Sequence, residues 1–394
     1  MDTQAFAGLF FIIFLSLLLI HQRKRLHVQG LFPALYFVMY RTSLGLDAMD
    51  YLGGKGRKFF KVLSPVIIGM GFLGMALITV ELLRGLYATV MQPQAAAGVG
   101  IVQPFWEGVP GTVFVPFFYF IISIFIIATI HEFSHGVLAR VWNIKVKSSG
   151  FAFLGIGLPV IPAAFVEPEE KQLQKRPLKQ QLAVFAAGPV SNIVLAFVIL
   201  LFMGSLMPPI AEAMFTPNGV EVTSFIDGNV TYPAENSELQ IGDIILKVNE
   251  HDIKDYQSFN ETLHLYAPNE TVNITTANAV HPITLTRHED RENGFLGVNV
   301  KAHLEDKPEF VARYGALVPA FTRWFTGLLY WLFVLNLGIG LFNLVPIGPI
   351  DGGRMLLAAL QYFYSEQKAK AIWSHTSTFL LACLILNIVL SIVL

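Results

Sequence analysis

The stretch FFYFIISIFIIATIHEFSH, residues 117–135, joins an apolar run directly to a cluster of titratable side chains. It lies within an apolar segment at 112–139, and about 20 mostly apolar residues suffice to cross a bilayer as a helix. Titratable side chains are costly inside such a helix unless they are paired or functional. His131, Glu132 and His135 therefore predict a functional site within a membrane span.

The spacing of the two histidines suits one metal ion. Residues i and i+4 of a helix share a face, so His131 and His135 can bind one Zn²⁺ per chain. Glu132 would then lie beside the open coordination position and act as general base. Chance alone predicts on the order of 0.01 such HExxH patterns in a chain of this composition. The alternative is a structural histidine pair near the membrane interface.

Composition supports a membrane protein. The chain has 394 residues, of which 54% are hydrophobic and 14% are charged, whereas soluble domains carry about 25% charged residues. The predicted spans lie at 4–20, 62–83, 112–139, 182–206, 317–345 and 372–394. The first lacks the basic start and small-residue cleavage site of a signal peptide, so we expect a retained anchor. One cysteine, Cys383, excludes an intrachain disulfide and a Cys-based zinc cluster.

The distribution of Lys and Arg predicts the orientation of these spans. Segments 21–61, 140–181 and 354–371 hold 18 of them, whereas the stretches assigned to the other face hold only Arg84, Arg313 and Arg323. Basic loops stay cytoplasmic. We therefore expect six spans with an extracytoplasmic N-terminus and a zinc site toward the cytoplasmic side of a cell membrane.

A third ligand should come from another span at the same depth. The stretch FNLVPIGPIDGG, residues 342–353, places Asp351 at the end of a span that runs in the same direction as the HExxH helix. We expect Pro346, Pro349 and the pair Gly352-Gly353 to break the helix. Irregular backbone at membrane depth lines a cavity or packs on protein. His131, His135 and Asp351 are therefore the predicted metal ligands.

Residues 207–310 differ from the rest of the chain. They hold 17 acidic and 6 basic residues, close to the charge density of a soluble domain. Short strands are predicted at 220–225, 243–248, 271–275, 282–286 and 295–300, with a helix at 256–266. The Pro233-Ala234 turn and the following LQIGDII, residues 239–245, resemble the core of a bacterial-type PDZ domain. We expect an inserted, extracytoplasmic α/β domain.

In its combined motifs the chain resembles the site-2 protease family of intramembrane zinc metalloproteases. That family combines HExxH, a Gly-Pro-x-x-Asn helix and an Asn-x-x-Pro-x-x-x-x-Asp-Gly motif, which match residues 131–135, 188–192 and 343–352. The resemblance covers about 112–206 and 317–360. Ile350 stands where Leu commonly precedes the ligand Asp, a change that should barely alter coordination. Two spans before HExxH, and no cysteine-rich insertion, resemble archaeal members.

The resemblance implies roles beyond the three ligands and Glu132. Asn192 and Asn343 would orient substrate or stabilise the oxyanion, although interhelical hydrogen bonding is an equal alternative. Gly188 is expected to permit close helix packing. The Gly- and Pro-rich segment 149–166 would form a membrane-associated β-hairpin that pairs with an unwound substrate. A buried re-entrant loop beside the zinc site is the alternative.

The predicted architecture is a polytopic α-helical membrane protein in four segments. These are two N-terminal spans with a basic loop (1–111), core helices with the hairpin (112–206), the PDZ-like domain (207–310) and a core helix with a C-terminal span (311–394). The predicted function is zinc-dependent intramembrane cleavage of single-span membrane proteins by regulated intramembrane proteolysis. The PDZ-like domain would contact peptide or substrate.

Two other functions stay open at this point. One is a membrane-anchored metallopeptidase that acts on soluble or misfolded chains. The other is a non-enzymatic transporter or scaffold with a PDZ module, which inverted repeats would support. A formal net charge of -1 indicates neither a nucleic-acid binder nor a strongly acidic surface.

Overall fold

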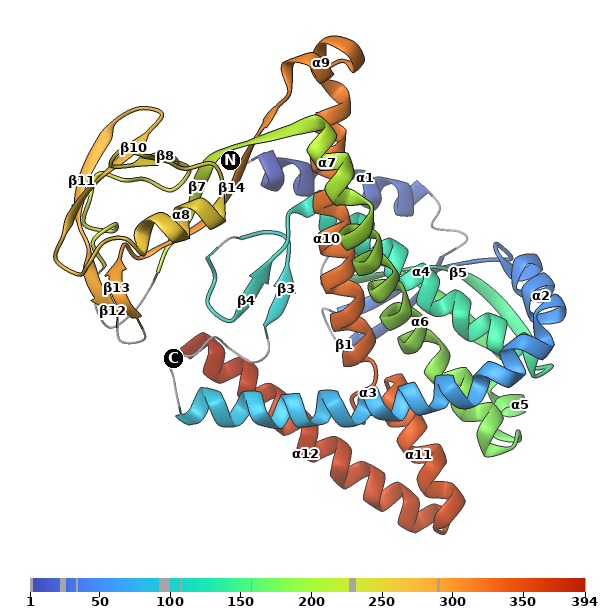
Figure 1. The fold of residues 1–394 in the computed structure, drawn as a ribbon. Coiled ribbons are helices and arrows are strands. Elements are labelled where there is room, and N and C mark those ends of the chain that lie inside the picture. Colours follow the sequence, from blue (N-terminus) through green and yellow to red (C-terminus); the bar gives the residue numbers. More distant parts are fainter. Residues whose placement is uncertain are drawn as a thin grey trace. The chain divides into compact units, whose positions relative to one another are not determined.

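The computed structural model describes residues 3–21, 26–32, 35–91, 100–106, 108–156, 158–226, 232–288 and 291–393. The chain forms two compact units (Figure 1). Unit 1 comprises residues 1–203 and 326–394, and unit 2 comprises residues 204–325.

Unit 1 is built mainly from helices, several of them long and apolar. They are α1 (Thr3–His21), α2 (Leu46–Lys55), α3 (Arg57–Met91), α4 (Phe117–Val141), α5 (Glu170–Gln174), α6 (Leu178–Ser205), α10 (Leu317–Phe342, which begins in unit 2), α11 (Asp351–Phe363) and α12 (Glu366–Val393). Among the described residues, five helices are long and apolar enough to span a membrane: α3, α4, α6 with its continuation to Met214, α10 and α12. These coincide with five of the six predicted spans. The sixth, 4–20, lies on α1, where the apolar helix within the described residues is the shorter Gly8–His21.

A four-stranded antiparallel sheet in unit 1 has the strand order β1-β2-β5-β6. Its strands are β1 (Leu26–Phe32), β2 (Leu35–Thr42), β5 (Val146–Ile156) and β6 (Leu158–Pro168). β5 and β6 form the hairpin predicted at 149–166, and β6 is an edge strand that packs against α4. A short parallel pair, β3 (Ile101–Gln103) and β4 (Thr112–Phe114), completes the strands of this unit.

The segment 21–61, treated above only as a basic loop, carries regular structure. It contains β1, β2 and α2, and β2 pairs with β5 from Leu35 opposite Ile156 to Thr42 opposite Ser149. The sequence of β2, LYFVMYRT, is rich in the aromatic and β-branched residues that strands favour. The predicted hairpin is therefore half of a larger, four-stranded sheet.

The break after α10 contains the two prolines expected there, Pro346 and Pro349, but not the two glycines. Residues 343–350 form the turn, with a cis peptide bond between Gly348 and Pro349. The pair Gly352-Gly353 does not break the helix, because both residues lie in the first turn of α11. A Cβ at Gly352 would collide with the carbonyl oxygens of Leu344 and Val345. These glycines therefore let α11 pack against the turn that precedes it.

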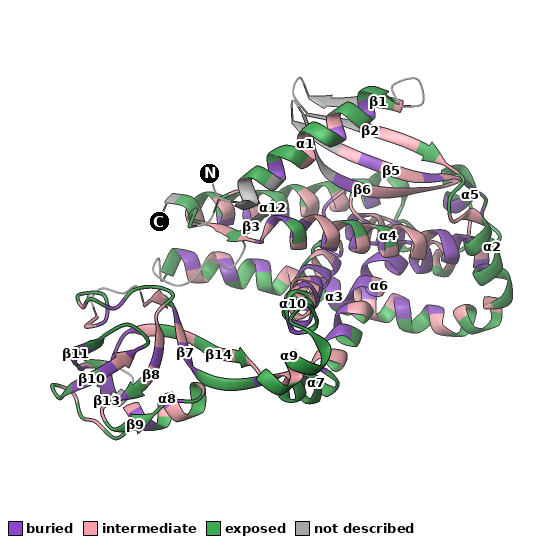
Figure 2. Ribbon diagram, turned by 90° about the horizontal axis from the view of Figure 1, so that it is seen from above, coloured by how far each residue is buried: buried purple, intermediate pink, exposed green. Residues whose placement is uncertain are grey.

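Buried residues of unit 1 gather where α4 and α6 meet (Figure 2). α6 presents small side chains there, and Ala183 and Ala186 are completely buried. Small residues let helix backbones approach closely, which is how helices associate in lipid. This contact brings the HExxH turn of α4 against the GPxxN segment of α6.

Unit 2 is an α/β fold. Its antiparallel sheet has the order β11-β10-β8-β7-β14, and a separate pair joins β12 to β13. The elements are α7 (Met207–Met214), β7 (Phe215–Phe225), β8 (Ile244–Val248), β9 (His251–Asp252), α8 (Tyr256–Leu263), β10 (Thr271–Thr276), β11 (Val280–Thr284), β12 (Thr286–His288), β13 (Arg291–Phe295), β14 (Val298–Asp306) and α9 (Pro308–Tyr314). The strand predicted at 295–300 is divided, because Gly297 has a φ of 85° and turns the chain between β13 and β14. The predicted helix at 256–266 ends at Leu263.

Candidate metal centre

Three predicted ligand side chains converge in unit 1. His131 and His135 lie one turn apart on α4, and Asp351 is the first residue of α11. His131 Nε2 lies 3.1 Å from Asp351 Oδ2 and 3.1 Å from His135 Nε2, and His135 Nε2 lies 3.3 Å from Asp351 Oδ2. The distance along the sequence between the histidines and the aspartate is 216 residues or more, so the fold itself assembles the cluster.

The spacing of these atoms fits a tetrahedral zinc site. Ligand atoms about 2.0–2.1 Å from a tetrahedral metal lie about 3.3–3.4 Å from one another. The observed separations of 3.1 to 3.3 Å are close to that value. His131 and Asp351 are only 8% and 9% exposed. Two neutral imidazoles and one carboxylate form a donor set that zinc favours, and three protein ligands leave a fourth position open.

Gly188 keeps the space between the ligand atoms free. A Cβ at this position of α6 would collide with His135 Nε2 and lie 2.6 Å from His131 Nε2. We expected Gly188 to permit helix packing, but the atoms it approaches most closely are the donor nitrogens themselves. The absence of a side chain therefore leaves a space where a metal ion fits.

A backbone contact defines the tautomer of a neutral His135. Its Nδ1 lies 2.6 Å from the carbonyl oxygen of Val184, which is on α6. A carbonyl oxygen only accepts, so Nδ1 carries the hydrogen and donates it. The lone pair of a neutral His135 is then on Nε2, which faces the cluster.

His131 has a matching partner on its outer side. Its Nδ1 lies 3.2 Å from the amide of Asn192, which is completely buried on α6. As oriented, Asn192 presents Nδ2, and its Oδ1 is buried without a hydrogen-bond partner among the described residues. Amide nitrogen and oxygen are assigned from their surroundings. A half-turn of the amide gives Oδ1 the Nδ1–H of His131 and leaves Nε2 free to bind a metal.

Glu132 lies beside the cluster and contacts the sheet. Its Oε2 accepts a hydrogen bond of 2.9 Å from the backbone N–H of Val166 on β6. A cavity of about 120 Å³ adjoins it, bounded mainly by apolar side chains that include Met49, Phe133 and Phe151. The general base expected from the sequence thus lies between the candidate ligands and the edge strand.

Asn343 is not brought into the cluster. Its Nδ2 donates to the carbonyl oxygen of Ile339, one turn earlier in α10, at 3.0 Å. The backbone carbonyl oxygen of Asn343 accepts a 2.8 Å hydrogen bond from the backbone N–H of Gly352. Asn343 therefore ties the end of α10 to the start of α11, and the oxyanion role expected for it stays a prediction.

Contacts on the far side of the turn hold Asp351 in place. Trp373 of α12 donates from Nε1 to the carbonyl oxygen of Gly353 at 2.9 Å, and its ring packs against Gly348. Arg354 of α11 donates to both carboxylate oxygens of Glu170 on α5, at 3.0 and 2.8 Å. Sequence patterns did not reveal these contacts, because each partner is an ordinary residue on a distant element.

The sequence model of peptidase family M50 matches residues 119–384, which include the whole cluster. The chain belongs to peptidase family M50. Protein MJ0971 of Methanocaldococcus jannaschii, which carries no assigned function, is 28% identical over 322 residues, covering 80% of this chain and 75% of that protein.

Relatives of this M50 chain include named zinc metalloproteases. The zinc metalloprotease RasP of Shouchella clausii is 25% identical over 50% of this chain and 55% of its own length. The regulator of sigma-W protease RasP of Bacillus subtilis is 25% identical over 50% and 54%. The matches thus span about half of each RasP protein. The PDZ domain of the SdrC-like protein Lmo2051 from Listeria monocytogenes is 24% identical over 22% of this chain and 90% of that domain, with a TM-score of 0.19.

Family membership and the cluster agree on the class of enzyme. The family and its zinc metalloproteases support metallopeptidase activity, and the group His131, His135 and Asp351 is compatible with zinc. The chain is a member of a metallopeptidase family, and several of its helices are long and apolar enough to span a membrane.

Proposed function

We propose that this metallopeptidase cleaves membrane-spanning substrates within or near the bilayer, with zinc held by His131, His135 and Asp351. The observation that carries the proposal is the convergence of three ligand atoms between helices of which α4 is long and apolar enough to span a membrane. A site that served soluble chains would open to water, whereas His131 and Asp351 are buried and His135 is partly buried. We further propose that the site faces the cytoplasm, as the Lys and Arg distribution indicates.

Glu132 would move the proton in this reaction. When bound, Zn²⁺ supplies Lewis acidity that polarises the scissile carbonyl and acidifies a water molecule. Glu132 accepts the proton of the attacking water and returns it to the leaving amine. Its hydrogen bond to Val166 N–H orients the carboxylate while leaving the second oxygen, Oε1, for that transfer.

The edge strand β6 would present the substrate. A helical substrate hides its peptide groups in its own hydrogen bonds, so it must unwind before cleavage. An extended segment can pair with an exposed strand edge. β6 is such an edge, and Val166 on it already contacts Glu132. The cavity next to Glu132 would take an apolar side chain near the scissile bond.

Unit 2 would contact substrates or peptides outside the membrane. Its groove of about 150 Å³ is bounded by α8 and β14, and it includes Phe259, Leu263 and the segment 294–300. β14 is an edge strand, so its outer side can accept an extended peptide.

The test uses the full chain reconstituted with a single-span membrane substrate. We expect Glu132→Gln to retain one zinc per chain and to cut at least about a hundredfold more slowly, since general acid–base groups contribute about 10²–10⁴-fold. The exposed Glu238→Gln is the matched control and should cut at the wild-type rate. Asp351→Asn should lose zinc.

Three outcomes would overturn parts of this proposal. A Glu132→Gln enzyme that binds zinc and cuts as fast as wild type removes the general base. Full zinc affinity in Asp351→Asn removes the third ligand. Equal cleavage of the same scissile sequence in a soluble peptide favours the alternative of a membrane-anchored peptidase for soluble chains.

A further inference from the structure

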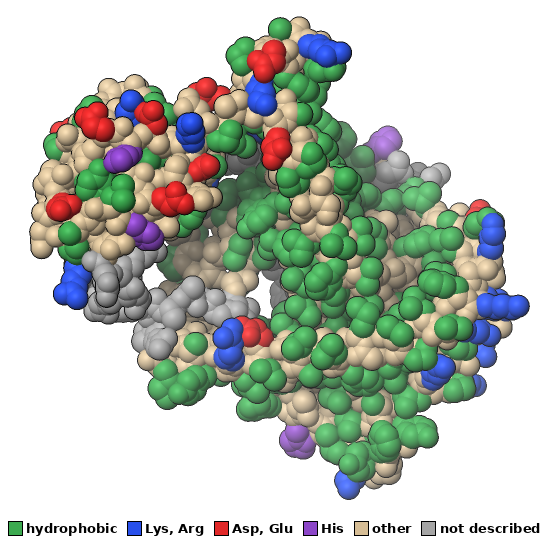
Figure 3. All heavy atoms as spheres, in the orientation of Figure 1, with side chains coloured by type: hydrophobic (Ala, Val, Ile, Leu, Met, Phe, Trp, Pro, Cys, Tyr) green, Lys and Arg blue, Asp and Glu red, His purple; other side chains and the backbone are tan. Residues whose placement is uncertain are grey.

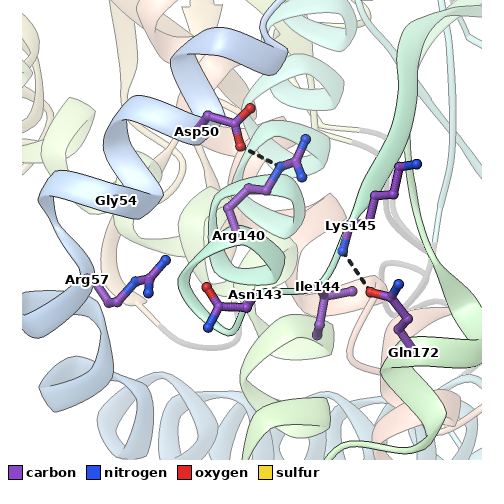
Figure 4. A pocket seen from close by; sticks show the side chains of 8 residues that line it. All are labelled: Asp50, Gly54, Arg57, Arg140, Asn143, Ile144, Lys145 and Gln172. Carbon is purple, nitrogen blue, oxygen red and sulfur yellow. Dashed lines mark hydrogen bonds and ion pairs between the residues drawn. The ribbon is translucent and has the colours of Figure 1, made fainter.

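A polar cavity of about 320 Å³ lies in unit 1 away from the metal cluster (Figure 4). Four helices and the loop after α4 form it. Its lining residues are Asp50 and Gly54 of α2, Arg57 of α3, Arg140 of α4, Asn143, Ile144 and Lys145 of the loop before β5, and Gln172 of α5. Its volume is within the range of about 300–1,000 Å³ that small-molecule sites occupy.

The cavity has an excess of positive charge. Arg57, Arg140 and Lys145 line it, and Asp50 is the one carboxylate in the lining. Asp50 is already paired, since its Oδ1 lies 2.8 Å from Arg140 Nε (Figure 4). Arg57 Nε is buried without a hydrogen-bond partner among the described residues. A buried guanidinium nitrogen left unpaired is costly, so this one calls for an acceptor.

The walls of the cavity are held by close packing. A Cβ at Gly53 would lie 2.7 Å from Arg140 Cβ, so α2 and α4 are in near contact there. Arg176 donates to the carbonyl oxygen of Asn143 at 2.9 Å, and the N–H of Lys145 donates to Gln172 Oε1 at 3.1 Å. Helix packing and hydrogen bonds therefore hold the backbone around the cavity in place.

Retention of loops on the cytoplasmic side does not by itself require this arrangement. The positive-inside effect depends on the number of Lys and Arg residues near span ends. In Figure 3, Lys and Arg side chains gather over α2 and the start of α3. Three of the basic residues in these segments instead line one cavity, and Arg57 Nε has no hydrogen-bond partner among the described residues.

The residues around this cavity are of types that are common at a membrane interface. Arg57 begins the long apolar helix α3, and Arg140 lies in the last turn of α4. Lys61 Nζ lies 5.2 Å from the ring centroid of Trp142, next to the cavity. Trp and Lys are typical of the headgroup level, and basic pockets between spanning helices bind anionic lipid headgroups.

We propose that this cavity binds the phosphate of an anionic phospholipid headgroup. Guanidinium groups match phosphate oxygens in bidentate geometry, and Lys145 adds a point charge. The phosphate would supply the acceptor that Arg57 Nε lacks. The lipid would link α2, α3 and α4 at the end of the helix that carries His131 and His135.

The experiment is native mass spectrometry of the full chain in detergent, with phosphatidylglycerol or phosphatidylcholine added. We expect one phosphatidylglycerol to bind at about a tenfold lower concentration than phosphatidylcholine. The double variant Arg57→Gln/Lys145→Gln should lose this preference, since one basic residue near an anionic headgroup changes affinity about fivefold. The control Lys58→Gln/Lys171→Gln removes two exposed charges outside the lining and should keep it.

A steric variant tests the cavity without changing charge. A Cβ at Gly54 meets nothing within 4 Å, so Gly54→Leu fills open space, and it also favours the helix. It should abolish the phosphatidylglycerol preference, while elution volume and zinc content, measured for every variant, stay unchanged. If both pocket variants bind phosphatidylglycerol like wild type, or the control loses it equally, the proposal is overturned. Displacement of the lipid by an equal concentration of inorganic phosphate would also overturn it, in favour of a soluble phosphate.

Discussion

Gly188 matters because of what a side chain there would occupy. Its missing Cβ would lie against both donor nitrogens of His131 and His135. Gly188→Ala should therefore weaken zinc binding by more than the about 10–100-fold that loss of an outer hydrogen bond costs. Zinc content per chain and zinc affinity measure this.

Gly204→Ala is the matched control for Gly188→Ala. Gly204 is on the same helix, α6, and a Cβ there has open space. Both substitutions improve helix propensity by about 0.8–1 kcal/mol. If Gly188→Ala binds zinc normally, the bound ion does not occupy the space next to Gly188 and between the two histidines.

We predict that Asn192 positions the ring of His131. With its amide turned, Oδ1 accepts from Nδ1–H and holds the ring with Nε2 toward the cluster. Asn192→Leu should weaken zinc binding about 10–100-fold. Asn192→Asp, which keeps the acceptor, should retain most of the affinity.

A role for Asn192 in the reaction alone would give a different result. Zinc affinity would then be unchanged in Asn192→Leu, and only kcat would fall. Measuring zinc affinity separately from kcat distinguishes the positioning role from the oxyanion role that the family resemblance implies.

At the scale of elements, α8 depends on its N-terminal cap. Asp255 Oδ1 accepts a 2.8 Å hydrogen bond from Ser258 N–H, and the Ser258 side chain bonds the N–H of Asp255 in return. The bond from the Ser258 backbone is the main cause that holds the pKa of Asp255 below its ordinary value of about 3.9. The ionised cap therefore stabilises α8 fully when the pH is above that ordinary pKa. This stabilisation is lost as the pH falls through the lowered pKa.

Hydrogen exchange of the α8 amides in the full chain tests this pH dependence. After correction for intrinsic exchange, protection should fall on acidification in wild type. Asp255→Asn keeps a capping oxygen that does not titrate, so the cap's contribution to the pH dependence should disappear. A pH dependence of equal size in Asp255→Asn would assign it to another group.

Features that depend on residue type and spacing can be predicted from the sequence, whereas contacts made by backbone atoms or between distant elements cannot. The clustering of these three side chains was predictable from residue type and spacing: His131 and His135 share a helix face, and Asp351 follows a span. The hydrogen bond that the Val184 carbonyl accepts from His135 and the one that Val166 N–H donates to Glu132 were not predictable, because any residue type supplies these backbone atoms. The cavity at Arg57 and Arg140 needed the fold, since its cations come from separate elements.

At the scale of the whole molecule, charge is unevenly divided. Residues 207–310 carry 17 acidic and 6 basic residues, a net charge of -11, whereas the other 290 residues carry 21 basic and 11 acidic, a net charge of +10. A total of -1 hides this division. Since basic segments are retained in the cytoplasm, we expect the acidic residues 207–310 on the opposite side of the membrane from the basic segments.

Cysteine labelling in intact cells tests this orientation. The chain has one cysteine, Cys383, which is buried, so wild type should react little with an impermeant maleimide. Asn236 and Lys58 are exposed. Asn236→Cys should be labelled in intact cells, and Lys58→Cys only after the membrane is opened. The reverse pattern would place the basic segments outside, and with them the end of the molecule where we propose the zinc site and the lipid cavity.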